Sequence, residues 1–145
     1  MIPPLIDVGG PWLVLLPGIH DASLVEIATQ YATSEYRTTL FTGFVQGYSI
    51  LRDAGSPAIF LNGSFVSDRP RPSDFDCCWD PRGVDDTKLD PVMLDFSNKR
   101  FAQKKKFGGE FFPSTAQAAP GRFFLDYFQE DKHTGAPKGI IRVHE

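Results

Sequence analysis

Two aspartates, one residue apart, are the side chains of this sequence best suited to chemistry. Asp74 and Asp76 follow a polar loop and precede the apolar run Cys77-Cys78-Trp79. Side chains alternate between the faces of a strand, so Asp74 and Asp76 would point the same way, with their Cα atoms about 6.6 Å apart. Two carboxylates at that separation can hold one or two hard cations. The pair therefore predicts a metal site, with two aspartates that merely end a strand at the surface as the alternative.

The elements that must position this pair lie directly before it. An apolar run over residues 58–61 is followed by Gly63-Ser64 and by a polar loop with two prolines that ends at Ser73. Apolar runs bounded by Gly, Ser and Pro are typical of strands joined by turns. We therefore expect a strand, a tight turn, a loop and a second strand that carries the aspartates.

The order Gly-Ser, variable loop, Asp-x-Asp resembles the signature of the nucleotidyltransferase superfamily of DNA polymerase β type. The loop between Ser64 and Asp74 has the length expected for small members. The segments 12–22, 111–113 and 137–141 also look like those of a small bacterial and phage branch of that superfamily. Asp-x-Asp alone is common by chance, and the strand-loop-strand context makes the signal more specific. The resemblance implies a minimal nucleotidyltransferase with a nucleotidyltransferase-like fold.

The resemblance also implies metal ligands. Asp74 and Asp76 would bind Mg²⁺ or Mn²⁺, and a third carboxylate from a later neighbouring strand would complete the site. Glu110 is our candidate because it opens a short strand after a basic helix, although aspartate is the residue expected there. A solvent-facing strand residue is the alternative for Glu110. Asp95 and Asp126 fall in helical patterns and fit less well.

Nucleotide-binding residues follow from the same resemblance. Gly63 and Ser64 would form the turn under a nucleoside triphosphate, because glycine lets the backbone approach and exposed N–H groups bind anions. An ordinary turn at a strand end is the alternative. Arg69 and Arg71 in the loop are candidates for phosphate contacts, since a guanidinium matches phosphate oxygens, and Lys138 is a further candidate. Solvated loop charges are the alternative for the two arginines.

Length and composition set the class of protein. A chain of 145 residues fits a single domain, residues 1–145, and 41% hydrophobic residues suffice for a core. The net charge of −3 does not indicate a strongly basic nucleic-acid module. No apolar run approaches a membrane span and no leader pattern is readable, so we expect a cytoplasmic protein without membrane contact. The adjacent Cys77 and Cys78 are poor disulfide partners and are expected to pack in a buried strand.

The first half of the chain predicts helices before the strand at residues 58–62. Residues 1–11 are rich in Pro and Gly and predict an irregular N-terminal arm. Ser23 and Glu26 have the spacing of a capping box at the start of a first helix. A longer amphipathic helix is expected from about Ser34 to Gly55. Within it, Gly43 and Gly47 indicate a close packing contact.

The second half predicts a helix from about Pro91 to residue 107, a strand at 110–113, a helical aromatic cluster at 123–128 and a closing strand at 139–144. This order is typical of an α+β fold, a small mixed β-sheet backed by helices. The basic residues of the first of these helices could bind RNA or an acidic partner, with a solvated helix face as the alternative: Lys99, Arg100, Lys104, Lys105 and Lys106.

The main hypothesis is transfer of a nucleoside monophosphate from a nucleoside triphosphate to a hydroxyl of an RNA, such as tRNA, or of a protein. The small bacterial members imply a toxin-antitoxin or phage-defence setting. The alternative is a catalytically inactive module of the same fold that binds a partner protein. The small size of the chain favours that alternative, because little room remains for an acceptor-binding domain. The Gly-Ser turn and the paired aspartates argue against it.

Overall fold

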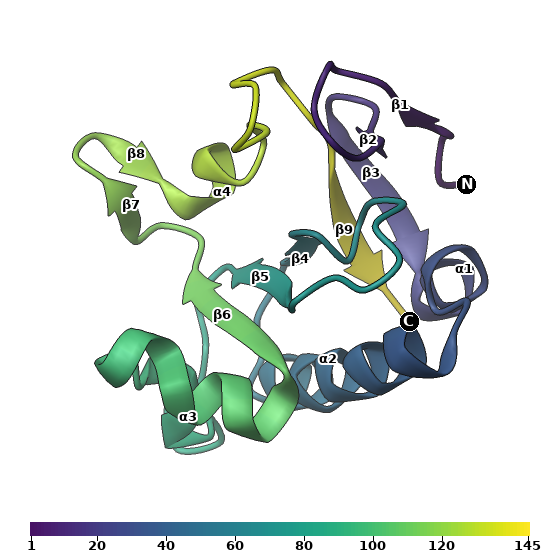
Figure 1. Cartoon of the computed structure of the whole chain (residues 1–145). Coiled ribbons are helices and arrows are strands. Elements are labelled where there is room, and N and C mark those ends of the chain that lie inside the picture. The colour runs from purple at the N-terminus through teal and green to yellow at the C-terminus, as the bar shows by residue number, and fades with distance from the viewer.

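A five-stranded mixed sheet forms the centre of the computed structural model, which describes residues 1–145 (Figure 1). The strands in spatial order are β3 (Ile19–Ser23), β9 (Ile140–His144), β4 (Ile59–Asn62), β5 (Phe75–Trp79) and β6 (Gly109–Pro113). The helices are α1 (Leu24–Tyr31), α2 (Glu35–Asp53), α3 (Ser97–Phe107) and the single turn α4 (Phe124–Tyr127). The predicted α+β fold, a small mixed sheet backed by helices, is confirmed.

Strand directions in the sheet are mixed. β4 runs antiparallel to both of its neighbours, β5 and β9, whereas β6 is parallel to β5 and β3 is parallel to β9. The closing strand β9 therefore lies inside the sheet. Two small antiparallel pairs lie outside it: β1 (Leu5–Ile6) with β2 (Val14–Leu15), and β7 (Gln117–Ala119) with β8 (Arg122–Phe123).

The two N-terminal helices begin where the sequence predicts. Ser23 and Glu26 form a complete capping box at the start of α1. The Ser34 hydroxyl accepts a hydrogen bond from the Arg37 amide at 3.1 Å and caps α2. Gly55, with a φ of 95°, follows the end of α2 in the left-handed conformation that favours glycine. None of the helices is both long and apolar enough to cross a membrane.

The main core lies between α2 and one face of the sheet. Phe75, Cys77 and Phe111 belong to this core, whereas their strand neighbours Cys78 and Phe112 belong to a small cluster on the other face. Both cysteines are buried and free, as predicted. In Figure 1, α2 crosses one side of the sheet, and α4 with the β7–β8 pair lies on the other. The second face is therefore only partly covered.

Close packing of α2 against the β6 region explains its two internal glycines. A Cβ on Gly43 would lie 1.7 Å from the carbonyl oxygen of Phe107, and one on Gly47 would lie 2.3 Å from Cζ of Phe111. The predicted close contact is confirmed. It places the junction of α3 and β6, and hence the start of β6, directly on α2.

The expected continuous helix over residues 91–107 is wrong. A 3₁₀ turn, η1 (Pro91–Leu94), comes first, and Asn98, Lys99 and Arg100 then adopt left-handed φ angles of 50°, 55° and 61°. The Asp95 carboxylate accepts hydrogen bonds from the amide and hydroxyl of Ser97, and such local bonds compete with a helix.

Two smaller expectations also need correction. The N-terminal arm is not wholly irregular, because its residues in β1 pair with β2. The aromatic cluster at residues 123–128 forms only the single turn α4, since the preceding residues pair in β8. The chain around these residues is therefore a hairpin followed by one helical turn.

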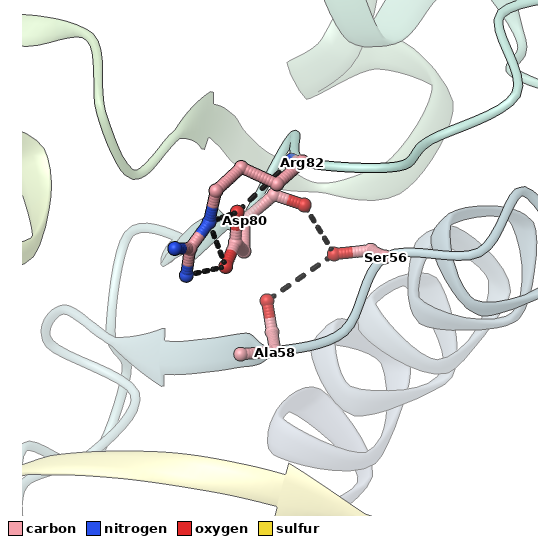
Figure 2. A network of polar contacts seen from close by, with 4 residues as sticks. All are labelled: Ser56, Ala58, Asp80 and Arg82. Carbon is pink, nitrogen blue, oxygen red and sulfur yellow. Dashed lines mark hydrogen bonds and ion pairs between the residues drawn. The ribbon is translucent and has the colours of Figure 1, made fainter.

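A network of hydrogen bonds joins the end of β5, away from the two aspartates, to the chain before β4 (Figure 2). The Asp80 amide donates to the Ala58 carbonyl at 2.9 Å, and the Ser56 hydroxyl donates to the Asp80 carbonyl at 2.8 Å. The buried Asp80 carboxylate accepts hydrogen bonds from Arg82, the shortest at 2.6 Å. These bonds join β4 to β5 and so fix the antiparallel pair that carries the aspartates.

Candidate metal and phosphate site

Three carboxylates meet at the start of β5. One oxygen each from Asp74, Asp76 and Glu110 lies within 4.8 Å of the others. Asp76 and Glu110 are direct partners in the parallel pairing of β5 with β6, and Asp74 immediately precedes β5. The structure thus brings together the two aspartates and the third carboxylate that the sequence singled out.

The cluster lies on the less covered face of the sheet. Asn62, Asp76 and Glu110 are aligned across β4, β5 and β6, and aligned residues on neighbouring strands share a face. Their strand neighbours Phe60, Cys78 and Phe112 pack in the small cluster on that face. Asn62 is buried and donates a hydrogen bond to the Phe128 carbonyl. This bond ties the chain after α4 to the edge of the carboxylate row.

The charges in the cluster are poorly compensated. Burial raises the pKa of Asp76 to about 7, with further contributions from Asp74 and Glu110. Burial, and then Glu110, also raises the pKa of Asp74. Neither aspartate carboxylate has a cation within ion-pair distance. Glu110 differs, because Arg100 Nε and Lys104 Nζ lie 2.6 and 3.6 Å from its two oxygens.

The turn at Gly63-Ser64 is shaped around Asp76. Gly63 has a φ of 88°, and a Cβ there would lie 2.8 Å from both the amide nitrogen and Oδ2 of Asp76. Only glycine leaves this space open. The Ser64 hydroxyl donates to the Asp74 carbonyl at 3.2 Å, which joins the two ends of the loop over residues 65–73.

A buried arginine that the sequence analysis missed holds this loop. The Arg37 guanidinium, on the first turn of α2, donates to the carbonyls of Phe65, Ser67 and Arg69 at 2.8, 2.8 and 2.6 Å. It also donates to the carbonyl of Tyr31 at 3.2 Å. No carboxylate lies within ion-pair distance of Arg37. An arginine bound to backbone carbonyls alone fixes the path of the chain between the glycine turn and the aspartates.

Two adjoining cavities open beside Asp76, the one carboxylate of the three that lines them. The larger, of about 320 Å³, is lined by polar and aromatic residues: Asn62, Asp76, Tyr127, Phe128, Glu130, Asp131, Lys132, Gly135 and Lys138. The smaller, of about 70 Å³, is lined mainly by the turn, by cations and by their neighbours: Trp12, Val14, Gly63, Ser64, Val66, Ser67, Arg69, Asp76, Asp131, Lys132, His133 and Lys138. Four residues, Asp76 among them, line both.

The basic residues of these cavities are available to an anion. Arg69, Lys132 and Lys138 form no ion pair with any carboxylate of the chain, although the Arg69 guanidinium lies 5.8 Å from the Trp12 ring. Burial lowers the pKa of Lys138, and the charge of Asp76 opposes this shift. Cations without an acid partner at one opening suit phosphate oxygens.

The remaining candidates lie elsewhere. The Arg71 guanidinium lies 4.3 Å from the ring centre of Tyr36 and lines neither cavity. Asp95 closes the turn at Ser97, and Asp126 is exposed on α4. The structure therefore brings Arg69 and Lys138 to the site, and not Arg71.

The turn over residues 131–135 carries two further cavity residues, Lys132 and His133, which the sequence analysis did not assign to the site. The buried Asp131 carboxylate accepts hydrogen bonds from the amide and hydroxyl of Thr134 at 2.9 and 2.8 Å, and these bonds keep its pKa low despite burial. The turn so formed presents Lys132 and His133 to the smaller cavity. A Lys-His pair in a glycine-containing turn, close before Lys138, is the signal that could have found them.

The donor set fits a hard divalent cation. Carboxylate oxygens are the ligands that Mg²⁺ and Mn²⁺ prefer, and the Asp74 and Asp76 carboxylates form no ion pair with a cation of the protein. The glycine at position 63 keeps the space beside Asp76 Oδ2 free of a side chain. Asp74, Asp76 and Glu110 are thus the residues that would hold such an ion.

Comparison with known families gives one match. The model of a family of unknown function, DUF6932, matches residues 11–144. The chain belongs to this family. Comparisons with the curated proteins and with the solved structures give no match. The DUF6932 match covers all three carboxylates, the glycine turn and the basic residues of the cavities.

Proposed function

We propose that this DUF6932 protein is a metal-dependent nucleotidyltransferase. The observation that supports the proposal is the meeting of Asp74, Asp76 and Glu110 beside the Gly63-Ser64 turn. Three clustered carboxylates bring a cost in repulsion, which a purely structural sheet edge has no reason to keep. The resemblance of this strand, turn and loop to the nucleotidyltransferase signature supports the same proposal.

The reaction transfers a nucleoside monophosphate to an acceptor hydroxyl. The hydroxyl oxygen forms a bond to the α-phosphorus, the bond between that phosphorus and the bridging oxygen breaks, and pyrophosphate leaves with that oxygen. When Mg²⁺ or Mn²⁺ is bound, it supplies charge neutralisation at the phosphates and lowers the pKa of the attacking hydroxyl. The reaction needs no covalent intermediate on the protein.

The residues of the site have separate tasks in this proposal. Gly63 and Ser64 let the phosphates approach the backbone, and Arg69, Lys132 and Lys138 bind the phosphate oxygens. Asp74 and Asp76 would hold the cation, with Glu110 as the third ligand. Glu110, on the neighbouring strand, orients the acceptor hydroxyl and accepts its proton, a role that requires Arg100 and Lys104 to release at least one of its oxygens.

The proposed substrates are a nucleoside triphosphate and the hydroxyl of an RNA, such as tRNA, or of a protein. The proposed setting is the cytoplasm, within a toxin-antitoxin or phage-defence system. This setting rests on the resemblance to small bacterial and phage nucleotidyltransferases.

A transfer assay tests the proposal. The protein is incubated with Mg²⁺, cell RNA and cell protein and each of the four triphosphates, labelled at the α-phosphate, and the products are separated by denaturing electrophoresis. Label should enter one acceptor class with wild type and with Asp86→Asn, an exposed loop aspartate, and should be absent with Asp76→Asn. Absence of transfer from all four triphosphates with wild type would overturn the proposal.

One observation favours a second candidate, an inactive module of the same fold that binds a partner protein. Both oxygens of Glu110 are already bound by cations of α3, as in a purely structural ion pair. Thermal unfolding separates the candidates, because a ligand that binds only the folded state raises the melting temperature. A shift with Mg²⁺ and a triphosphate together supports the enzyme, and no shift with any triphosphate supports the module.

A further inference from the structure

Helix α3 carries positive charge that its own residues do not offset. Residues 97–107 contain no acidic side chain and five basic ones: Lys99, Arg100, Lys104, Lys105 and Lys106. A solvated helix face is usually supported by acids three or four positions from its cations. Acids elsewhere in the chain pair with three of the five, Glu110 with Arg100 and Lys104 and Asp90 with Lys106, which leaves Lys99 and Lys105 without an acid partner. Such a concentration of charge, in a chain of net charge −3, indicates an anionic partner.

Exposed aromatic rings accompany these cations. Phe101 is 58% exposed on the face of α3 opposite the buried Gln103 and Phe107, and Lys105 Nζ lies 6.0 Å from its ring centre. Phe96, just before α3, is 40% exposed, and its ring lies parallel to that of Phe112. An exposed ring beside a cation, as at Phe101 and Lys105, is the arrangement on which single-stranded nucleic acids stack their bases.

The backbone at the start of α3, close to the carboxylates, has an unfavourable conformation. Three successive residues that are not glycine, Asn98 to Arg100, hold left-handed φ angles. This conformation is unfavourable for residues with a Cβ, and it persists where the surroundings require it, often at functional sites. Here it places the Arg100 guanidinium on Glu110, with Nε 2.6 Å from a carboxylate oxygen.

The basic surface therefore adjoins the candidate site directly. Arg100 and Lys104 face Glu110, whereas Lys99, Phe101 and Lys105 are exposed on the same segment. A polyanion that lies along α3 would meet Arg100 and Lys104, which contact Glu110. Its phosphates would compete with Glu110 for Arg100 and Lys104.

We propose that α3 binds the acceptor, and that the acceptor is a single-stranded nucleic acid with a free 3′ hydroxyl. Its phosphates bind Lys99 and Lys105 and draw Arg100 and Lys104 away from Glu110, while a base stacks on Phe101. Glu110 is then free to act on the hydroxyl. This inference rests on the proposed function and selects, among its acceptors, nucleic acid over protein. An acidic protein would satisfy the cations but would leave the exposed rings unexplained.

The test measures acceptor binding without any triphosphate. Fluorescence anisotropy follows a 5′-labelled oligouridylate, with oligothymidylate as the DNA arm and polyglutamate as a competing polyanion. Lys105→Glu should weaken binding, and the slope of log affinity against log salt should fall by about 1 for the lost phosphate contact. Phe101→Ala should weaken binding about tenfold, because stacking is lost. Lys88→Glu, an exposed loop lysine with the same charge change, should leave binding unchanged.

The outcomes separate this inference from the proposed function. Loss of oligonucleotide binding in Lys105→Glu and Phe101→Ala, with unchanged melting temperature and triphosphate-induced shift, supports the inference, and the two arms tell RNA from DNA. Three results overturn it. The first is wild type that binds triphosphate but no oligonucleotide, and the second is polyglutamate that competes as well as unlabelled oligonucleotide while Phe101→Ala has no effect. The third is transfer of label to protein alone. Loss of the triphosphate-induced shift in wild type is instead a failure of the proposed function.

Discussion

Asp76 of β5 and Glu110 of β6 lie directly opposite each other on adjacent parallel strands. Like charges at opposed positions destabilise a sheet, and burial already raises the pKa of Asp76 to about 7. Arg100 and Lys104 compensate Glu110 but lie beyond ion-pair distance of either aspartate. The arrangement costs stability in the metal-free protein, and a bound cation would reverse that cost.

Replacement of Asp76 by asparagine tests this relation. In EDTA, Asp76→Asn should be as stable as wild type or more stable by up to about 1 kcal/mol, because one of two opposed like charges is removed. With Mg²⁺ and triphosphate, wild type should gain melting temperature and the variant should gain little. Differential scanning calorimetry measures both. An equal ligand-induced shift in the variant would remove Asp76 from the metal site.

The glycine contact of α2 with the start of β6 predicts a second result. Gly43→Ala should gain about 1 kcal/mol of helix propensity but lose more from the clash with the Phe107 carbonyl. The net effect should be a loss of about 2 kcal/mol, as for other overpacked sites. Urea unfolding gives the value, with Gln46→Ala on the exposed face of α2 as the control. A stabilised Gly43→Ala variant would show that this packing is wrong.

Arg37 should control the order of the loop that precedes the aspartates. Arg37→Lys keeps the charge but cannot reach all four carbonyls, and Arg37→Ala should cost about 3 kcal/mol by leaving buried carbonyls without donors. Both variants should be cut faster by thermolysin near Phe65 and Val66, as measured by mass spectrometry. Arg71→Lys, in the same loop but exposed, should be cut like wild type. Equal cleavage of all variants would contradict the role of Arg37.

Local patterns sufficed to predict much of the fold. The capping box at Ser23, the helix that starts after Ser34 and the strands on either side of the Gly63 turn depend on residues close in sequence. The proximity of Glu110 to the two aspartates has a different origin. Its position next to Asp76 depends on the parallel pairing of β5 with β6, which a resemblance can suggest and local patterns cannot.

The parts that escaped prediction depend on contacts between distant residues or on local competition. In the sequence, Arg37 resembles any other polar residue of an amphipathic helix. Its four carbonyl acceptors come close to it only when the chain folds. Lys132 and His133 follow no periodic pattern, and the cavities bring them to Asp76 from a turn near the end of the chain. The break before α3 arises because Asp95 bonds to Ser97, which apolar spacing does not show.

Acid should weaken the network at the far end of β5. Hydrogen bonds from Arg82 lower the pKa of Asp80 below its usual value (Figure 2). A carboxylate with a lowered pKa stabilises the folded state above its unfolded pKa of about 4, and this contribution disappears as the pH falls through the lower folded value. Asp80→Asn should therefore cost about 1 kcal/mol near neutral pH, since Arg82 is exposed, and less near pH 3.

Urea unfolding at both pH values measures this difference. Asp86→Asn, an exposed aspartate of the same loop whose carboxylate accepts no hydrogen bond, should show no such change with pH. A cost of Asp80→Asn that stays constant between neutral pH and acid would mean that the ion pair does not stabilise the protein.

Glu110→Gln should separate binding from transfer. The amide keeps the size of the side chain but can neither accept a proton from the acceptor hydroxyl nor supply a negative ligand. Triphosphate binding, held mainly by Asp74, Asp76 and the cavity cations, should persist as a ligand-induced rise in melting temperature. Transfer should be lost, which is the pattern of an interaction made mainly in the transition state.

A structural effect of Glu110→Gln needs its own control, because Glu110 also anchors Arg100 and Lys104. Arg100→Ala with Lys104→Ala breaks the same contacts but leaves the carboxylate in place. The double variant should lose affinity for oligonucleotide, whereas Glu110→Gln should keep or raise that affinity, since its two cations are freed. Anisotropy and the transfer assay together decide the outcome. Full transfer by Glu110→Gln would place the third carboxylate elsewhere. If Glu110→Gln instead lost as much oligonucleotide affinity as the double variant, Glu110 would only anchor Arg100 and Lys104.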